Sequence, residues 1–331
     1  MDEQDELIPS TNPHNISNNP IYYKRQYGQY APEPMNYWTQ FALFLGLAGG
    51  GLVVGSLVAV IIVKIMVPTA NLFELDKVIM QPENANAAKV LQLVTTVFMF
   101  FLPAFFFALI VHKKPLAYLG FNKTISIQQI GLVILIAWAA IFVGSILGEW
   151  NEMIPIPKNW AAYFRKAEDQ YAGQVEAMAK MKNIKDYFVA LLVIALTPAL
   201  VEELFFRGTM QQLLVSWFGN AWLGIIITSI VFSAIHMSYY GFLTRASLGV
   251  VLGLLYYYSK NIWLNILAHF LNNAIAVTSL YIFSLQGKPM KDALEDHFPT
   301  WLGLGGIVFL VALMINFKRK SEDLLAEKAS F

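Results

Sequence analysis

The residues best suited to chemistry lie in a short polar cluster, "TPALVEELFFRGTM", at residues 197–210. Its apolar surroundings make ionisable side chains costly, so their presence points to a function. Glu203 and Arg207 are four residues apart, so on a helix they share a face and can pair, which lowers the cost of holding either charge away from water. Glu202 is turned by about 100° from Glu203 and is left free for chemistry. The simpler interpretation is a buried ion pair that only fixes helix packing.

Two of the five histidines also occur in apolar segments. "SIVFSAIHMSYY" places His236 four residues after Phe232, and "NILAHFLNNAIAV" places Asn265, His269 and Asn273 at successive four-residue steps on one helix face. A single histidine of this kind is most often a hydrogen-bonded core residue. Several polar groups in neighbouring apolar helices must find partners where water is absent, so we expect them to gather around a common, hydrated cavity.

The composition identifies the elements that position these side chains as membrane helices. Hydrophobic residues make up 57% of the chain and charged residues 14%, which is too apolar for an ordinary soluble domain and indicates a polytopic membrane protein. The formal net charge of +1 gives no reason to expect a nucleic-acid partner. The absence of cysteine excludes disulfides, thiolate metal ligands and a cysteine nucleophile.

We predict an all-α fold, a polytopic transmembrane helical bundle of about eight spans. A helix needs about twenty apolar residues to cross a hydrocarbon core of about 30 Å. The fourth span is predicted as one long helix, because "LFFRGTMQQLLVSWF" continues the apolar pattern for about four turns, and Pro198 is expected to kink it. The predicted spans are 41–67, 90–111, 127–147, 187–217, 222–240, 245–259, 262–285 and 301–317.

These spans divide the chain into five parts. The parts are a polar N-terminal tail (1–40), helices one to three (41–147), an extramembrane or interfacial amphipathic segment (148–186), a catalytic core in helices four to seven (187–285), and the last helix with a basic tail (286–331). The N-terminal tail lacks a basic region followed by a short apolar core, so a cleavable signal peptide is not expected. An even number of spans puts both termini on one side, and the positive-inside rule makes that side the cytoplasm. Segment 148–186 would then lie outside, as a helix on the membrane surface or as a solvated helical hairpin.

Three motifs resemble those of the CPBP family of intramembrane proteases, which includes the CAAX prenyl endopeptidases and bacteriocin-processing or immunity proteins. They are Glu-Glu-x-x-x-Arg as "EELFFR", Phe-x-x-x-His as "FSAIH" and His-x-x-x-Asn as "HFLNN". The resemblance covers about residues 187–280, and the order and spacing of the motifs fit. It implies hydrolysis of a peptide bond by an activated water, with Glu203 and Arg207 as a supporting pair.

The resemblance also implies a role for each remaining motif residue. Glu202 corresponds to the general base, and His236 helps to hold and polarise the water. His269 and Asn273 correspond to donors that stabilise the tetrahedral oxyanion. General chemistry agrees with this division, because a carboxylate in an apolar cavity is a stronger base than one in water, and fixed donors in a water-poor site stabilise developing charge better than bulk solvent does.

A zinc ion is the main alternative within this chemistry. Glu202, His236 and His269 would form a zinc set with an open fourth position. We favour no metal cofactor, because Asn273 is a better hydrogen-bond donor than a zinc ligand. The sequence contains no His-Glu-x-x-His helix signature, no Gly-x-Ser-x-Gly elbow and no aspartate within a predicted span.

Functions from two other classes stay open. Intramembrane glutamate and histidine also occur in ion- or proton-coupled transporters, although the two halves of the sequence show no matching broken helices. A non-catalytic immunity or scaffold protein on the same fold would keep the motifs for packing. The expected partners are membrane lipids and a membrane-anchored or hydrophobic peptide or protein substrate, with CAAX-type and leader-peptide processing both open.

Overall fold

The computed structural model describes residues 35–178, 181, 183–287 and 298–329 of the 331-residue chain. Most of these residues are helical and none is in a β-strand, which confirms the all-α prediction. The α-helices are α2 (Tyr37–Met66), α3 (Leu75–Ile79), α4 (Ala85–Thr96), α5 (Leu102–Val111), α6 (Pro115–Tyr118), α7 (Ile127–Glu152), α8 (Lys158–Met178), α9 (Ile184–Ala190), α10 (Thr197–Phe205), α11 (Gln212–Phe218), α12 (Ala221–Ala234), α13 (Phe242–Ser259), α14 (Ile262–Leu285) and α16 (Thr300–Ala329). The π-helical turns η4 (Val97–Phe101), η5 (Leu191–Leu196) and η6 (Phe206–Gln211) join successive α-helices, and η2 (Leu72–Glu74) and η3 (Pro82–Asn84) are 3₁₀ turns.

Six helical stretches of the described residues are long and apolar enough to cross a membrane. Each coincides with one of the predicted spans, and the other two predictions correspond to the shorter helices α12 and α13. The chain is therefore a polytopic helical membrane protein. The six stretches are Tyr37–Met66, Ala85–Val111, Ile127–Glu152, Ile184–Phe218, Ile262–Leu285 and Thr300–Glu327.

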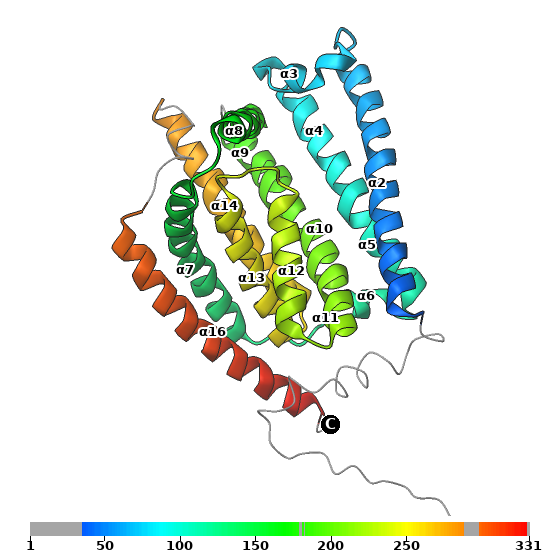
Figure 1. The fold of residues 1–331 in the computed structure, drawn as a ribbon, viewed down its shortest axis with the longest axis vertical. Helices are drawn as coiled ribbons and strands as arrows, with labels where there is room; N and C mark the ends of the chain where they lie inside the picture. The colour runs from blue at the N-terminus through cyan, green and yellow to red at the C-terminus, as the bar shows by residue number, and fades with distance from the viewer. Residues whose placement is uncertain (1–34, 179–180, 182, 288–297, 330–331) are drawn as a thin grey trace, which may run out of the picture.

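The long helices run between two ends of one bundle (Figure 1). α2 begins and α16 ends at the same end, as expected for an even number of crossings. The exposed Lys113, Lys114 and Lys123 lie in the connection from α5 to α7 at this end, whereas the connection from α7 to α9 lies at the other. Most of the predicted polar tail, residues 1–34, lies outside the described residues.

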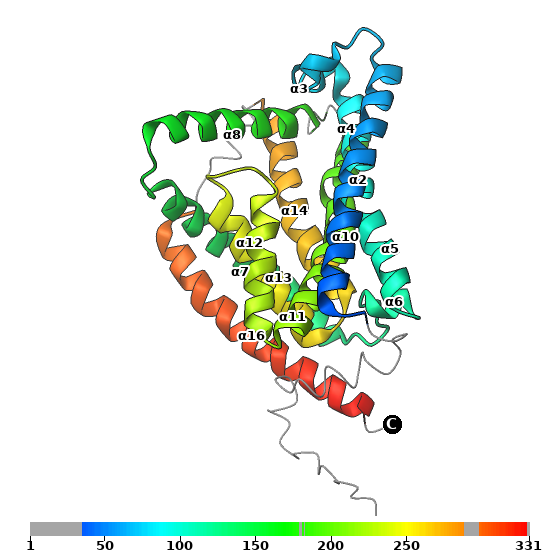
Figure 2. The same ribbon diagram turned by 45° about the vertical axis from the view of Figure 1, so that its right-hand side comes forward.

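The segment between α7 and α9 contains one long helix, α8, which lies across the end of the bundle (Figure 2). It runs at a large angle to α14 and α12, whose ends it passes. A single long helix across the end of the bundle is compatible with the predicted surface helix, and the place of segment 148–186 relative to the membrane stays a prediction.

Widened turns accommodate the prolines of two spans. Proline has no amide hydrogen, and its ring clashes with the carbonyl group one turn earlier. The π turns η4 and η5 end directly before α5 and α10, which carry Pro103 and Pro198 in their first turns. The amide of Thr197 accordingly donates to the carbonyl oxygen of Leu192, five residues back. The expected kink site at Pro198 is thus a π turn within one continuous helix, Ile184–Phe218.

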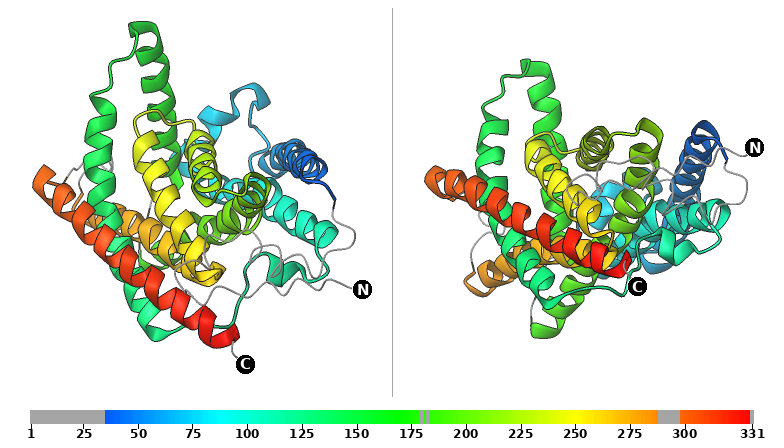
Figure 3. Two further views of the ribbon diagram at one scale, coloured as in Figure 1. Left: turned by 60° about the horizontal axis from the view of Figure 1, so that its bottom comes forward. Right: turned by 90° about the horizontal axis from the view of Figure 1, so that it is seen from below.

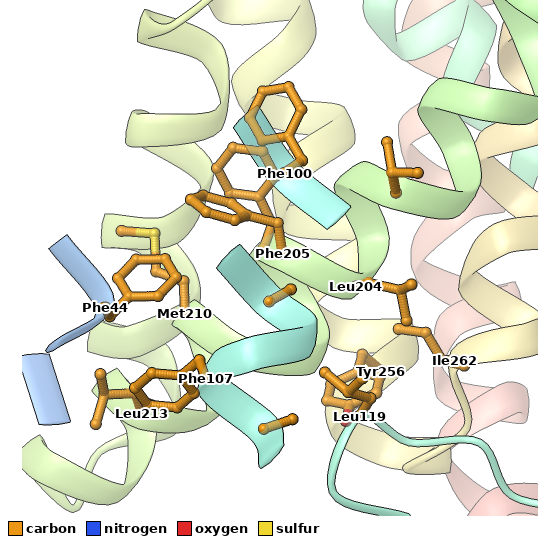
Figure 4. Close-up of a cluster of buried hydrophobic side chains, with 14 of the residues drawn as sticks. Phe44, Phe100, Phe107, Leu119, Leu204, Phe205, Met210, Leu213, Tyr256 and Ile262 are labelled. Atoms are coloured by element: carbon orange, nitrogen blue, oxygen red, sulfur yellow. The ribbon is translucent and has the colours of Figure 1, made fainter. Parts of the chain in front are cut away.

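An aromatic cluster holds α10 against the N-terminal helices (Figure 4). The ring centroid of Phe205 lies 4.8 Å from that of Phe44 in α2 and 5.2 Å from that of Phe100 in η4. All three side chains are buried, and aromatic pairs of this kind stabilise packing beyond the burial of their surface. Because this face of α10 packs on α2 and η4, another face is left for α13 and α14.

The last helix, α16, crosses the outside of α7 and α13 (Figure 3). Leu313, Met314 and Phe317 of α16 are buried in a cluster with residues of both helices. A buried hydrogen bond from Gln129 Nε2 in α7 to Ser321 Oγ in α16, 3.0 Å long, adds a fixed polar contact. The last helix therefore completes the bundle without adding a residue to the predicted site.

Single-cysteine labelling tests the predicted orientation. Lys123 and Asp169 are exposed at opposite ends of the bundle, and the chain has no native cysteine. We expect Asp169→Cys to react with a membrane-impermeant maleimide added to intact cells, and Lys123→Cys to react only after permeabilisation, because short basic loops stay in the cytoplasm. The opposite labelling pattern would reverse the orientation.

Candidate functional site

A buried ion pair between Glu203 in α10 and Arg207 in η6 forms the centre of the site. Arg207 Nη1 lies 2.7 Å from Glu203 Oε1, and both side chains are fully buried. Arg207 Nη2 donates to the carbonyl oxygen of Gly249 in α13 at 3.1 Å. A Cβ on Gly249 would lie 2.8 Å from Ser229 Cβ in α12, so glycine allows the close approach of these two helices. The pairing predicted from the four-residue spacing is confirmed, and it joins the fourth predicted span to α13.

Glu203 also joins this pair to α14. His269 Nδ1 lies 2.8 Å from Glu203 Oε1, and Asn265 Nδ2 donates to Glu203 Oε2 at 3.3 Å. The amide of Asn265 also donates to the carbonyl oxygen of Leu252 in α13 at 2.6 Å. Asn265 and His269 therefore share the helix face predicted from their spacing. Because donors meet both of its oxygens, Glu203 is already engaged and is not available as a base.

Glu202 lies beside this network without a hydrogen bond of its own to it. The residue is 7% exposed, and Oε2 has no hydrogen-bond partner within the described residues. His269 Nε2 lies 3.9 Å from this oxygen, which is beyond hydrogen-bond distance. A buried carboxylate oxygen without a donor is costly, so its presence indicates a bound water, a ligand or a catalytic role.

His236 lies outside the apolar helix predicted for it. α12 ends at Ala234, so the predicted span 222–240 is wrong beyond that residue. The amides of His236 and Met237 donate to carbonyl groups three residues earlier, and Met237 has a φ of 52°, which ends the helix. His236 is half-buried in this turn, and its Nδ1 lies 2.8 Å from the carbonyl oxygen of Phe232.

The ring of Phe232 contacts both histidines. Its centroid lies 5.2 Å from that of His236 and 5.8 Å from that of His269, with the rings edge to face. In each histidine Nδ1 faces an oxygen that only accepts, the carbonyl of Phe232 or the carboxylate of Glu203, so Nδ1 is the donor. Nε2 is therefore the nitrogen of each histidine that is left for a water or a substrate.

Asn273 is the predicted site residue that the structure does not join to the others. It lies on α14 one turn after His269 and is half-buried. Its side-chain contact is with the neighbouring Asn272, whose Nδ2 lies 3.4 Å from Asn273 Oδ1. The structure thus brings Glu202, Glu203, Arg207 and His269 together and links His236 to them through Phe232.

The zinc alternative needs Glu202, His236 and His269 to converge on one point. Among the side chains that the structure describes, no group of three or more His, Asp and Glu is placed to hold a metal ion. Among these three residues, the pair that approaches closely is Glu202 and His269, whose Oε2 and Nε2 atoms lie 3.9 Å apart. His236 and His269 each bond an oxygen through Nδ1 and keep Nε2 free, an arrangement that zinc-ligating histidines share, so metal removal is the test of this alternative.

Arg245 in α13 is a charged group near the site that the motifs did not indicate. Its positive charge interacts with Glu202 and with His236. Its guanidinium packs so closely on Gly241 that a Cβ there would overlap it. The signal was present in "FLTRASLGVVLGLL", because a lone charge in an apolar helix is itself a sign of function.

The fold and the site define a class, a polytopic membrane protein in which an ion pair, a second glutamate and two histidines gather within one group of helices. The family model described as "Type II CAAX prenyl endopeptidase Rce1-like" matches residues 184–275, the segment that contains all of these side chains. Residues 184–275 are thus similar to the Rce1-like type II CAAX prenyl endopeptidases, in agreement with the resemblance of the three motifs. The family does not favour an ion- or proton-coupled transporter.

The sequence of a curated relative also matches a part of this chain. It is an uncharacterized 24.3 kDa protein of Escherichia coli, 41% identical over 71 residues, which are 21% of this chain and 33% of that protein. The chain therefore spans about a third of the length of the curated relative that it matches. No solved structure matches.

Replacement of Arg207 tests the central ion pair. We expect Arg207→Leu to destabilise the protein by about 3–5 kcal/mol, because it leaves the carboxylate of Glu203 buried without its cation. Lys77→Leu is the matched control, because Lys77 pairs with Glu74 at 2.6 Å where the two side chains are 68% and 47% exposed. Loss of an exposed pair costs about 0–1 kcal/mol. Unfolding in detergent measures the difference, and equal losses in the two variants would contradict a structural role for Arg207.

Proposed function

We propose that this protein is an intramembrane endopeptidase that hydrolyses a peptide bond with a water activated by Glu202. The observation that carries the proposal is Glu202 Oε2, which is buried without a donor at 3.9 Å from His269 Nε2, while the adjacent Glu203 is fully engaged. A carboxylate held in this way beside a fixed imidazole is suited to take a proton from water. The family match over residues 184–275 supports the same chemistry.

In the first step, water adds to the carbonyl carbon of the scissile peptide bond. Glu202 takes one proton from the water while the water oxygen bonds to the carbonyl carbon of the scissile peptide, whose oxygen becomes an oxyanion. His236 accepts a hydrogen bond from the same water through Nε2, because its Nδ1 donates to Phe232. In the second step the protonated Glu202 gives its proton to the leaving nitrogen and the C–N bond breaks. The products are a carboxylic acid and an amine.

The oxyanion is stabilised by donors from α14. The carboxylate of Glu203 holds Nδ1 of His269, so the ring presents Nε2, and as an imidazolium it donates to the oxyanion while Glu203 balances the added charge. Asn273 supplies the second donor through its side-chain amide, which a change of rotamer would turn from Asn272 toward the substrate. Arg207 keeps Glu203 in place, so its role is to support His269.

The substrate that suits this site is a membrane-anchored or hydrophobic peptide or protein, presented to helices that are surrounded by lipid. CAAX-type processing and leader-peptide processing both meet this description. We place the N- and C-termini in the cytoplasm, on the basis of the basic loops at that end of the bundle. No metal ion is part of the proposed mechanism.

Replacement of Glu202 tests the base. We expect Glu202→Gln to lower the cleavage rate by about 10²–10⁴-fold, because general acid–base catalysis contributes that much and the amide cannot accept the proton. Glu176→Gln, at an exposed position of α8, is the charge-matched control and should cleave at the unaltered rate. The assay uses the protein in liposomes with prenylated peptides, unprenylated peptides and leader peptides. Unchanged cleavage in Glu202→Gln would refute the assignment of the base.

Metal removal separates the glutamate mechanism from the zinc mechanism. We expect a strong chelator to leave cleavage unchanged, because the described donors do not form a three-residue metal set. Added zinc after chelation should restore nothing. Loss of cleavage with chelator and its recovery with zinc would establish the metal alternative with Glu202, His236 and His269 as candidate ligands.

A further inference from the structure

Helix α8, in segment 148–186, contacts the turn between α12 and α13 that carries His236. Ser238 Oγ donates to Glu168 Oε2 at 2.6 Å. The ring of Tyr239 stacks on that of Phe164, with centroids 4.7 Å apart and planes 15° from parallel. Phe164 and Glu168 are four residues apart, so one face of α8 makes both contacts. Figure 2 shows α8 passing over the connection between α12 and α13, where these residues lie.

The hydroxyl of Ser238 connects Glu168 to the backbone of the turn. Ser238 is 3% exposed, and its Oγ also accepts from the amide of Gly241 at 3.2 Å. On the other side, Asn151 of α7 donates from Nδ2 to the carbonyl oxygen of Tyr239 at 2.8 Å. The turn between α12 and α13 is therefore held by side chains from both α7 and α8.

Met237, directly after His236, needs this support. Its φ of 52° lies in the left-handed region, which is unfavourable for a residue with a side chain and persists only where the surroundings impose it. Met237 is 68% exposed, so its own side chain contributes little packing to hold that conformation. The ring of His236 has one hydrogen bond, to the carbonyl of Phe232, so the direction of the ring depends on the backbone of the turn.

We propose that Glu168 is a positioning residue for His236, acting through Ser238 to fix the turn that directs the imidazole toward the Glu202–His269 site. The inference rests on the proposed function for its effect on catalysis. Its structural part, that Glu168 sets the environment of His236, is independent of that function. Because Glu168 lies on α8, this proposal makes the predicted extramembrane segment 148–186 contribute to the geometry of the catalytic site.

The experiment compares Glu168→Ala, Glu168→Gln and Ser238→Ala in the full chain in detergent and in liposomes. Asp169→Ala is the matched control, because Asp169 is the next residue of α8 and is exposed. Glu168→Gln keeps an oxygen that accepts from the hydroxyl of Ser238, so it should retain function. We expect Glu168→Ala and Ser238→Ala each to lower kcat about tenfold at constant KM, and the double variant to be no worse than either, because both remove one contact.

A spectroscopic readout follows His236 without any assay of cleavage. The chain has five histidines, so selective ¹³C,¹⁵N-histidine labelling gives few resonances, and His236→Gln assigns one of them. We expect the His236 resonance to shift in Glu168→Ala and Ser238→Ala and to stay in place in Asp169→Ala. The resonance of His112, after α5 at the far end of the bundle, should not move in any variant.

An unchanged His236 resonance in Glu168→Ala and Ser238→Ala overturns the proposal, as does cleavage by both variants at the rate of the unaltered protein. If one alanine variant fails to fold, the other, together with Glu168→Gln, decides between the same two results. If the unaltered protein cleaves no peptide, the proposed function fails, and the histidine spectra alone decide whether Glu168 positions His236.

Discussion

The buried pair of Glu203 and Arg207 is the interaction on which the rest of the site depends. Two charges without solvent are tolerated only when further hydrogen bonds satisfy their remaining atoms. Glu203 meets this need with His269 and Asn265 of α14. Arg207 meets it in part, through the carbonyl of Gly249 in α13, while its Nε has no hydrogen-bond partner among the described residues. The requirement to satisfy one ion pair thus holds α10, α13 and α14 at a fixed separation. The imidazole of His269 takes its orientation from that requirement.

Two adjacent glutamates have different environments because a helix turns by about 100° per residue. Glu203 meets donors from Arg207 and from Asn265 and His269 of α14, whereas Glu202 lies beside His269 and keeps an oxygen without a hydrogen-bond partner among the described residues. The free energy needed to bury Glu202 is therefore offset only in part, by the nearby positive charges of Arg207 and Arg245. This division of structure and chemistry between neighbours follows from the aromatic packing of Phe205, which sets the rotation of α10 about its own axis.

Local patterns in the sequence predicted the local features of the site, but they did not predict contacts between distant segments. The spacing of Glu203 and Arg207, and the apolar run beyond them, correctly predicted an ion pair on one long helix. The end of α12 was missed because apolar residues continue past Ala234, whereas the backbone at Met237 turns out of the helix. The acceptor at Gly249 could not be predicted, because a backbone carbonyl has no signature in the sequence. The contact of α8 with the turn after α12 depends on packing between segments about seventy residues apart.

The length of α12 explains why a helix of the extramembrane segment has to lie near the site. Fourteen residues make a helix about 21 Å long, which is less than the hydrocarbon core of about 30 Å. The helix therefore ends at Ala234, short of that thickness, whereas α14 has 24 residues. Irregular backbone at such a depth is stable only where protein or enclosed water covers it. Asn151 and Glu168 bond to the turn at Tyr239 and Ser238, so we expect a change in α8 to reach the imidazole of His236 through the turn.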